Sequence, residues 1–143
     1  MSQLSFDQQS VNDTIRRIRE FTKEMDDVIN NQLKLAAKKG ESLIKQRLTD
    51  NGQVITGRLR SSIHSETTNS DNYQYSDQAG GSFDGSLNTE ILENEIALGT
   101  NVNYAESVEF HSKKGNYFYP STDQMYSDLQ DRLKRIDKKV TEI

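Results

Sequence analysis

The side chains best suited to metal binding or catalysis in this chain are its two histidines, His64 and His111. Zinc chemistry needs several converging ligands and a base, which often appear as closely spaced histidines, cysteines or carboxylates. No His-x-x-x-His pair is present, and the chain has no cysteine. The sequence therefore predicts no metal site, and the lack of cysteine also removes disulfides and thiolate nucleophiles.

Serine hydrolysis and carboxylate acid–base chemistry are the other catalytic options. A nucleophilic serine needs an activating histidine, an orienting carboxylate and an oxyanion hole, but no Gly-x-Ser-x-Gly turn occurs. A glycosidase-type pair needs one carboxyl group in an apolar or aromatic pocket, and the chain has no tryptophan. We therefore predict no catalytic residue and no cofactor. We interpret the acidic cluster as a solvated or inter-subunit face: Glu90, Glu93, Glu95, Glu106 and Glu109.

Residues 69–89 are rich in glycine, aspartate, asparagine and serine, and this composition predicts a long flexible loop. Its aspartates lack the alternate-position spacing of a calcium loop, so we interpret them as turn residues: Asp71, Asp77 and Asp84. Its aromatic residues have two open interpretations, which are packing back onto the domain and anchoring a neighbouring subunit: Tyr73, Tyr75 and Phe83.

The net charge of −4 is unevenly distributed. Residues 1–50 contain nine basic and eight acidic side chains, residues 51–110 two and nine, and residues 111–143 seven and five. Nucleic-acid binding requires clustered Lys and Arg, so the acidic middle argues against a grip on phosphates. It fits contacts between unlike faces of neighbouring subunits. With no apolar run of about 18 residues and no secretory signal at the start, we expect synthesis in the cytoplasm and no membrane association.

The elements that position these residues follow from periodicity. Apolar residues at steps of three, four and seven predict a long amphipathic helix over residues 11–50, after an N-terminal tail of residues 1–10. A drift of the apolar stripe makes a bend or break at residues 38–40 plausible. Asn51-Gly52 is expected to end this helix.

The rest of the chain predicts a small sheet and two further helices. Residues 54–100 read as a large antiparallel β-hairpin: a loop leads into one strand near residue 63, the flexible loop follows, and residues 90–98 form the second strand. A short helix is expected over residues 103–110, with Tyr104, Ala105 and Val108 facing inward. A C-terminal helix is expected over residues 121–140, with an N-cap among Ser121, Thr122 and Asp123 after Pro120. The predicted class is α+β in a single domain.

Two glycines and two arginines in the middle segment have assigned roles. Gly57 and Gly99 are expected where the backbone needs a positive φ or a close approach. Arg58 and Arg60 are the only cations among residues 51–110. Because guanidinium pairs bidentately with carboxylate, we expect each to form a salt bridge to an acidic face, within the subunit or across an interface.

Three short blocks occur in order along the chain. The first is Thr-Gly-x-Leu-Arg-x-Ser-Ile, the second joins hydrophobic-Gly-Thr to Tyr-Ala-x-x-Val-Glu-Phe, and the third is an aromatic pair before Pro120. Together they resemble the gene-ten-like tail-completion family, which joins head and tail in long-tailed, lambdoid-type bacteriophages. His111 departs from the glycine usual at that position. The residues matched to the first two blocks are Thr56, Gly57, Leu59, Arg60, Ser62, Ile63, Gly99, Tyr104, Ala105, Val108, Glu109 and Phe110.

The resemblance implies a virion protein at the tail–head junction. Such a subunit would form a homo-oligomeric ring, typically of six copies. The ring would contact the tail tube or tail terminator on one side and the head connector on the other, and DNA would pass through its lumen. The matched residues would serve the interfaces. The alternative is an intracellular regulator or antitoxin-like module that binds one protein through its amphipathic helices.

Overall fold

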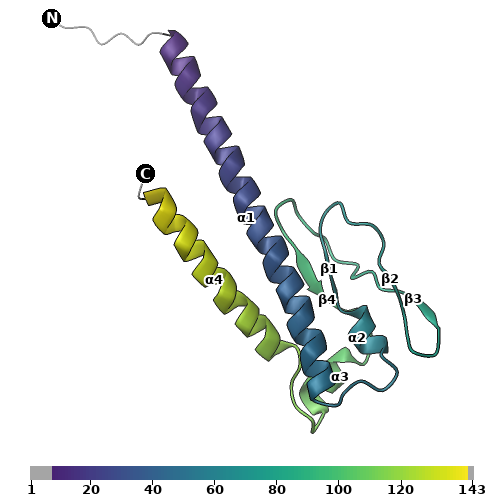
Figure 1. The fold of residues 1–143 in the computed structure, drawn as a ribbon. Coiled ribbons are helices and arrows are strands. Elements are labelled where there is room, and N and C mark those ends of the chain that lie inside the picture. The colour runs from purple at the N-terminus through teal and green to yellow at the C-terminus, as the bar shows by residue number, and fades with distance from the viewer. Residues whose placement is uncertain (1–7, 142–143) are drawn as a thin grey trace, which may run out of the picture. The chain divides into compact units, whose positions relative to one another are not determined.

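The computed structural model describes residues 8–141. The chain has the α+β class that the sequence predicted, with a long N-terminal helix, a C-terminal helix and two small antiparallel sheets (Figure 1). Residues 1–31 and residues 32–143 form two compact units, and each is described by itself below. Of the tail predicted for residues 1–10, residues 1–7 lie outside the described part, and residues 8–10 are helical.

Helix α1 (Gln8–Asp50) follows the predicted pattern because it has no proline and a regular apolar stripe. It ends where expected: Gly52 adopts a φ of 67°, and its N–H donates to Thr49 O at 3.0 Å. No break interrupts the helix at residues 38–40. Gly40 is buried there and allows close packing, since an added Cβ would lie 2.5 Å from Met125 Sδ.

The middle segment is built from shorter elements than predicted. The two ends of the large hairpin do pair: β1 (His64–Glu66) runs antiparallel to β4 (Ala97–Gly99). The segment before β1 was predicted to be a loop, and this prediction is wrong, because the segment forms helix α2 (Arg58–Ser62). The strand expected over residues 90–96 is absent, and the region is irregular with a turn at Asn94, which has a φ of 69°.

The loop of residues 69–89 is also more ordered than predicted. It contains a second antiparallel pair, β2 (Gln74–Ser76) with β3 (Ser82–Asp84). The turn role of two aspartates is confirmed. Asp77 Oδ1 accepts the N–H groups of Ala79 and Gly81 at 3.0 and 2.9 Å, and Asp84 Oδ1 accepts that of Ser86 at 3.0 Å.

Two helices close the chain, as expected, at slightly shifted boundaries. Helix α3 (Ala105–His111) is followed by α4 (Tyr119–Thr141). The N-cap predicted among Ser121, Thr122 and Asp123 is wrong, because α4 already begins at Tyr119 and Pro120 occupies its first turn. The N–H groups at this start are satisfied by a side chain from α3, described below.

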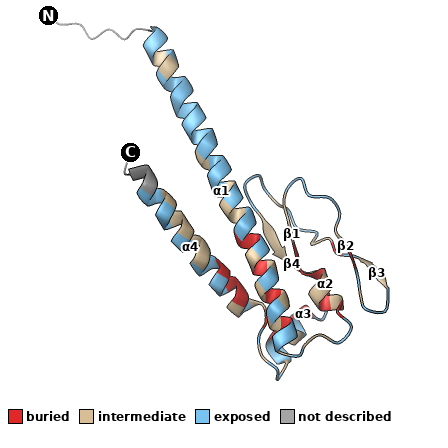
Figure 2. Ribbon diagram, in the orientation of Figure 1, coloured by how far each residue is buried: buried red, intermediate tan, exposed pale blue. Residues whose placement is uncertain are grey.

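The hydrophobic core lies in the unit of residues 32–143, between the C-terminal half of α1 and the short elements (Figure 2). Its buried side chains come from α1, α2, β2 and α3 and from the segments that connect the elements. They are Ile44, Leu48, Leu59, Ile63, Tyr75, Val102, Ala105 and Tyr117. The core is small, so a few residues of the middle segment decide how the elements meet.

The unit of residues 1–31 contributes only the first part of α1. Several large apolar side chains of the described part of this unit are exposed, including Ile15 at 43%, Ile18 at 59% and Phe21 at 49%.

Candidate functional site

The sequence blocks singled out above are joined in space. Ser62 Oγ lies 2.5 Å from Thr100 Oγ1, and His64 is the register partner of Gly99 in the β1–β4 pair. The first block and the first part of the second block therefore meet at one place in the fold, although the long middle loop separates them in the sequence.

Most residues of the first block are buried in this subunit. Leu59 is 5% exposed, and Ser62 and Ile63 are fully buried. The side chains of these three residues fill the core, and the interface role expected for them stays a prediction. Gly57 has a φ of 79° at the start of α2, as predicted. Gly99 does not, and an added Cβ there would meet only Leu87 Cδ2 at 3.8 Å.

His64 is buried and fully engaged by its neighbours. Its Nδ1 lies 2.8 Å from Ser62 O, and its Nε2 lies 2.5 Å from Glu66 Oε2. Since a carbonyl oxygen only accepts, Nδ1 carries the proton that it donates to Ser62 O. Glu66 Oε2 also accepts the N–H of Leu87 at 3.0 Å. The Glu66 carboxylate thus ties β1 to the segment before β4, and the imidazole holds that carboxylate in place.

The aromatic residues of the middle loop pack back onto the subunit. The Tyr73 ring stacks on His64 with centroids 3.8 Å apart, and its hydroxyl donates to Ser61 O at 2.7 Å. Tyr75 is 6% exposed and stacks on Phe83 at 5.3 Å. Of the two interpretations left open, packing onto the domain is confirmed for Tyr73 and Tyr75. They are not free anchors for a neighbour.

Neither arginine of the middle segment forms the expected ion pair with a residue among positions 8–141. Arg58 lies over the Phe83 ring at 4.2 Å and its Nε donates to the Tyr75 hydroxyl at 3.4 Å. This hydrogen bond raises the pKa of Arg58. Arg60 donates from Nη1 to Thr49 Oγ1 at 3.2 Å. Arg58 therefore contacts an aromatic ring and a hydroxyl within the middle segment, and Arg60 links this segment to a hydroxyl on α1.

Glu109 has a structural role that the sequence did not reveal. It is buried on α3, and its Oε2 accepts the N–H groups of Tyr117 and Phe118 at 2.9 and 2.7 Å. Its Oε1 accepts that of Tyr119 at 3.3 Å. Tyr119 is the first residue of α4 and the other two residues immediately precede it, so a carboxylate from α3 caps the start of α4. No local pattern could indicate this, because the acceptor lies eight to ten residues before the donors.

The inner side of α3 is only partly as predicted. Ala105 is buried and Val108 packs against the core, whereas Tyr104 precedes the helix and is 38% exposed. Ala105 and Glu109 therefore cannot make the surface contacts expected of matched residues. Their backbone and side-chain groups instead hold Tyr117, whose hydroxyl donates to Ala105 O at 3.0 Å.

Exposed residues remain for contacts with other molecules. Thr56, Tyr104 and Phe110 keep accessible surface from the matched blocks. Glu90, Glu93 and Glu95 are all exposed, in agreement with a solvated or inter-subunit acidic face. Phe110 lies 5.7 Å from Tyr119 between ring centroids, which makes an exposed aromatic pair at the start of α4.

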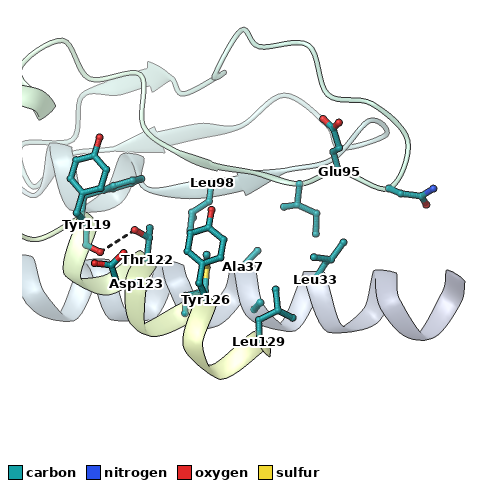
Figure 3. A pocket seen from close by; sticks show the side chains of 14 residues that line it. Leu33, Ala37, Glu95, Leu98, Tyr119, Thr122, Asp123, Tyr126 and Leu129 are labelled. Carbon is teal, nitrogen blue, oxygen red and sulfur yellow. Dashed lines mark hydrogen bonds between the residues drawn. The ribbon is translucent and has the colours of Figure 1, made fainter. Parts of the chain in front are cut away.

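An apolar groove of about 700 Å³ opens beside this pair, and we call it the α1–α4 groove (Figure 3). Leu33, Ala36 and Ala37 of α1 form one wall, and residues 94–98 form another. The third wall is α4, where Tyr119 and Tyr126 stand at the rim and are 53% and 58% exposed. Figure 3 shows the Tyr119 and Tyr126 side chains extending from α4 on its side toward residues 94–98. An ion pair between Lys39 and Asp128 links the two helices nearby.

The lining of this groove is mostly apolar, and two exposed tyrosines stand beside it. Exposed tyrosines around an apolar floor are typical of interface hot spots. Among residues 8–141, no group of three or more His, Asp or Glu side chains converges as a metal site would require. In the same part of the chain, no helix is long and apolar enough to span a membrane.

Comparisons of the chain with protein-family models, with curated proteins and with solved structures find no match.

Proposed function

We propose that this protein is a structural subunit of a tailed-bacteriophage virion, a tail-completion or head–tail connector protein at the neck. In this role it assembles into a ring, with six copies as the expected number, and DNA passes through the lumen. Its neighbours would be the tail tube or tail terminator on one side and the head connector on the other. The three ordered sequence blocks suggested this class, and the α+β arrangement of helices beside a small antiparallel sheet is compatible with it.

The observation that carries the proposal is the α1–α4 groove with its exposed aromatic rim. The apolar lining of this groove is open in the free subunit and is available to a binding partner. Tyr119, Tyr126 and Phe110 offer large apolar area at little conformational cost, as subunit contacts require. In the proposed ring, an apolar face of a neighbouring virion protein or copy covers this groove.

The acidic segment has a separate role in this proposal. Glu90, Glu93 and Glu95 are exposed, and they belong to the stretch with two basic and nine acidic residues. Facing the lumen, these carboxylates repel the DNA backbone and ease its passage. A virion in which all three are lysine should release its DNA more slowly. A virion in which all three are glutamine serves as the size-matched control. Unchanged release by the lysine variant contradicts the lumen role.

The proposal is tested by locating the chain in purified mature particles. Mass spectrometry should detect it at a few copies per particle, and a labelled chain should appear at the neck in images. A particle population that lacks the chain overturns the proposal.

The alternative is a regulator that binds one protein through its amphipathic helices, and the exposed stripe of α1 also fits that reading. The two candidates differ in stoichiometry. A virion subunit forms rings whose population rises with concentration or on contact with tails, whereas a regulator forms a small complex of fixed ratio. Light scattering and negative-stain images of the protein mixed with purified tails distinguish them.

A further inference from the structure

The first part of α1 carries an apolar stripe with the spacing of a coiled coil. Its members alternate at steps of four and three residues, which is a repeat of 3.5: Val11, Ile15, Ile18, Thr22, Met25 and Ile29. The whole stripe lies within the unit of residues 1–31. Three of its isoleucines are exposed, Ile15, Ile18 and Ile29, at 43%, 59% and 38%.

The two flanks of the stripe differ in chemistry. Phe21 and Val28, at 49% and 37% exposure, extend the apolar surface on one side. Arg19 and Asp26 occupy the other side and are both exposed. Within residues 8–141 neither of these two charged residues forms an ion pair. One flank thus carries Phe21 and Val28, and the other carries one charge of each sign at equivalent heptad positions, seven residues apart.

We propose that residues 18–29 of this stripe are covered by the same residues of a second copy of this chain, running antiparallel. Charge and shape select this partner and direction. When Ile18 of one copy lies opposite Ile29 of the other, Thr22 lies opposite Met25. The same alignment places Arg19 opposite Asp26 twice, once on each side of the two-fold axis. It also places each Phe21 against Val28 of the second copy.

A parallel pair would lose these contacts. In that direction Arg19 would face Thr14, and Asp26 would face Phe21 of the neighbouring helix. A carboxylate placed against an aromatic ring loses hydration without gaining a partner. The antiparallel pair therefore satisfies both flanks, whereas the parallel pair satisfies neither.

This pairing describes the free protein and does not depend on the neck role. A two-fold contact closes at two copies, because both use the same surface. A particle that lacks the chain would overturn the proposed function and leave the α1 pair intact. Failure of the α1 pair would leave the location in the virion unaffected.

The charged flank provides the first test, with the full-length chain in sedimentation-velocity experiments over a range of concentrations. The unaltered protein should show a monomer–dimer equilibrium. Arg19→Asp should raise the dimer dissociation constant roughly tenfold, because two attractive contacts become repulsive. Asp26→Arg should do the same, and the double exchange of Arg19→Asp with Asp26→Arg should restore dimerisation. Lys23→Asp, on the opposite side of the helix, makes the same charge change and should leave the dissociation constant unaltered.

The direction of pairing is tested by cross-linking, which the absence of native cysteine simplifies. Ile18→Cys mixed with Ile29→Cys should give a disulfide-linked heterodimer on mild oxidation. Ile18→Cys alone should not, since its two thiols would lie about 16 Å apart along the antiparallel seam, beyond the reach of a disulfide. Self-linked Ile18→Cys would indicate a parallel pair and overturn the proposal. A protein that stays monomeric at its highest soluble concentration would also overturn it.

Discussion

Glu109 Oε2 accepts the N–H of Phe118 at 2.7 Å, and through this contact helix α3 caps helix α4. Two more N–H groups at the same helix start depend on the same carboxylate. Because α4 supplies one wall of the α1–α4 groove, the geometry of that groove depends on a residue that does not line it. The short helix α3 is therefore best understood as the support of α4.

The first prediction concerns this cap. Glu109→Ala removes the acceptor from three N–H groups in a buried setting, and we expect it to lower the free energy of unfolding by about 3 kcal/mol. Urea denaturation followed by circular dichroism measures the change. Glu106→Ala is the matched control, because Glu106 is exposed on the same helix, and its effect should stay within about 0.5 kcal/mol. If Glu109→Ala lowers the free energy of unfolding no more than Glu106→Ala does, the cap is unimportant for stability.

A second prediction concerns the close approach of the middle hairpin to its own tyrosines. A Cβ on Gly85 would lie 2.6 Å from Tyr73 Cδ1 and 3.0 Å from Tyr75 Cδ1. The Tyr73 ring cannot easily yield, because it is stacked on His64 and its hydroxyl is bonded to Ser61 O. We expect Gly85→Ala to destabilise the protein by about 2 kcal/mol.

Gly99→Ala is the control for this effect, since an added Cβ there finds only Leu87 Cδ2 at 3.8 Å. Its unfolding free energy should stay within about 0.5 kcal/mol of the unaltered protein. Thermal unfolding of the two variants side by side makes the comparison. If Gly99→Ala proves the more harmful of the two, the hairpin packing described here is wrong.

The third prediction is a dependence of stability on alkaline pH. Burial, with a smaller contribution from the nearby Glu109, raises the pKa of the Tyr117 hydroxyl well above its usual value of about 10. A group whose pKa is raised in the folded state retains its proton there while the unfolded chain loses it. Its stabilising contribution is therefore complete below about pH 10 and declines as the pH rises above that value, by up to about 1.4 kcal/mol per pH unit.

Tyr117→Phe should remove this part of the alkaline loss. At neutral pH it should cost about 1 kcal/mol, because the hydrogen bond to Ala105 O is lost. Above pH 10 its stability should fall less steeply than that of the unaltered protein, as measured by urea midpoints at several pH values. Tyr126→Phe, at an exposed position, should leave the alkaline slope as it is. Parallel slopes for Tyr117→Phe and the unaltered chain would contradict the prediction.

The extent to which sequence predicts this structure follows from the range of the interactions. Helix α1 and the C-terminal helix were predictable because their apolar residues repeat locally over many turns. The β1–β4 pairing was also predictable, since two stretches with strand propensity flank one loop. Helix α2 was missed because its five residues are too few for a periodic signal, and a core contact through Leu59 fixes it.

The candidate site was less accessible to sequence reasoning. The blocks that were matched as interface residues turned out to contain core and cap residues, Leu59, Ile63 and Glu109 among them. A short motif does not separate a residue that builds the fold from one that contacts a partner, because burial is set by distant segments. The rim tyrosines, Tyr119 and Tyr126, lie in α4, and only the packing of α4 beside α1 and residues 94–98 brings them to one groove.

The fourth prediction tests the groove itself and separates assembly from stability. Tyr126 is 58% exposed, so Tyr126→Ala should change the free energy of unfolding by no more than about 0.5 kcal/mol. If the groove binds a virion neighbour, the same substitution should lower the yield of joined particles at least tenfold, because a buried aromatic anchor contributes about 2 kcal/mol or more to an interface. Gln124 is exposed on the same helix and does not line the groove. Gln124→Ala should therefore change neither the free energy of unfolding nor the yield of joined particles. Infectious titre with unjoined heads and tails counted by electron microscopy measures the joining, and urea denaturation of the purified variants measures the stability. A Tyr126→Ala variant that joins particles at the normal level would remove the groove from the proposed interface.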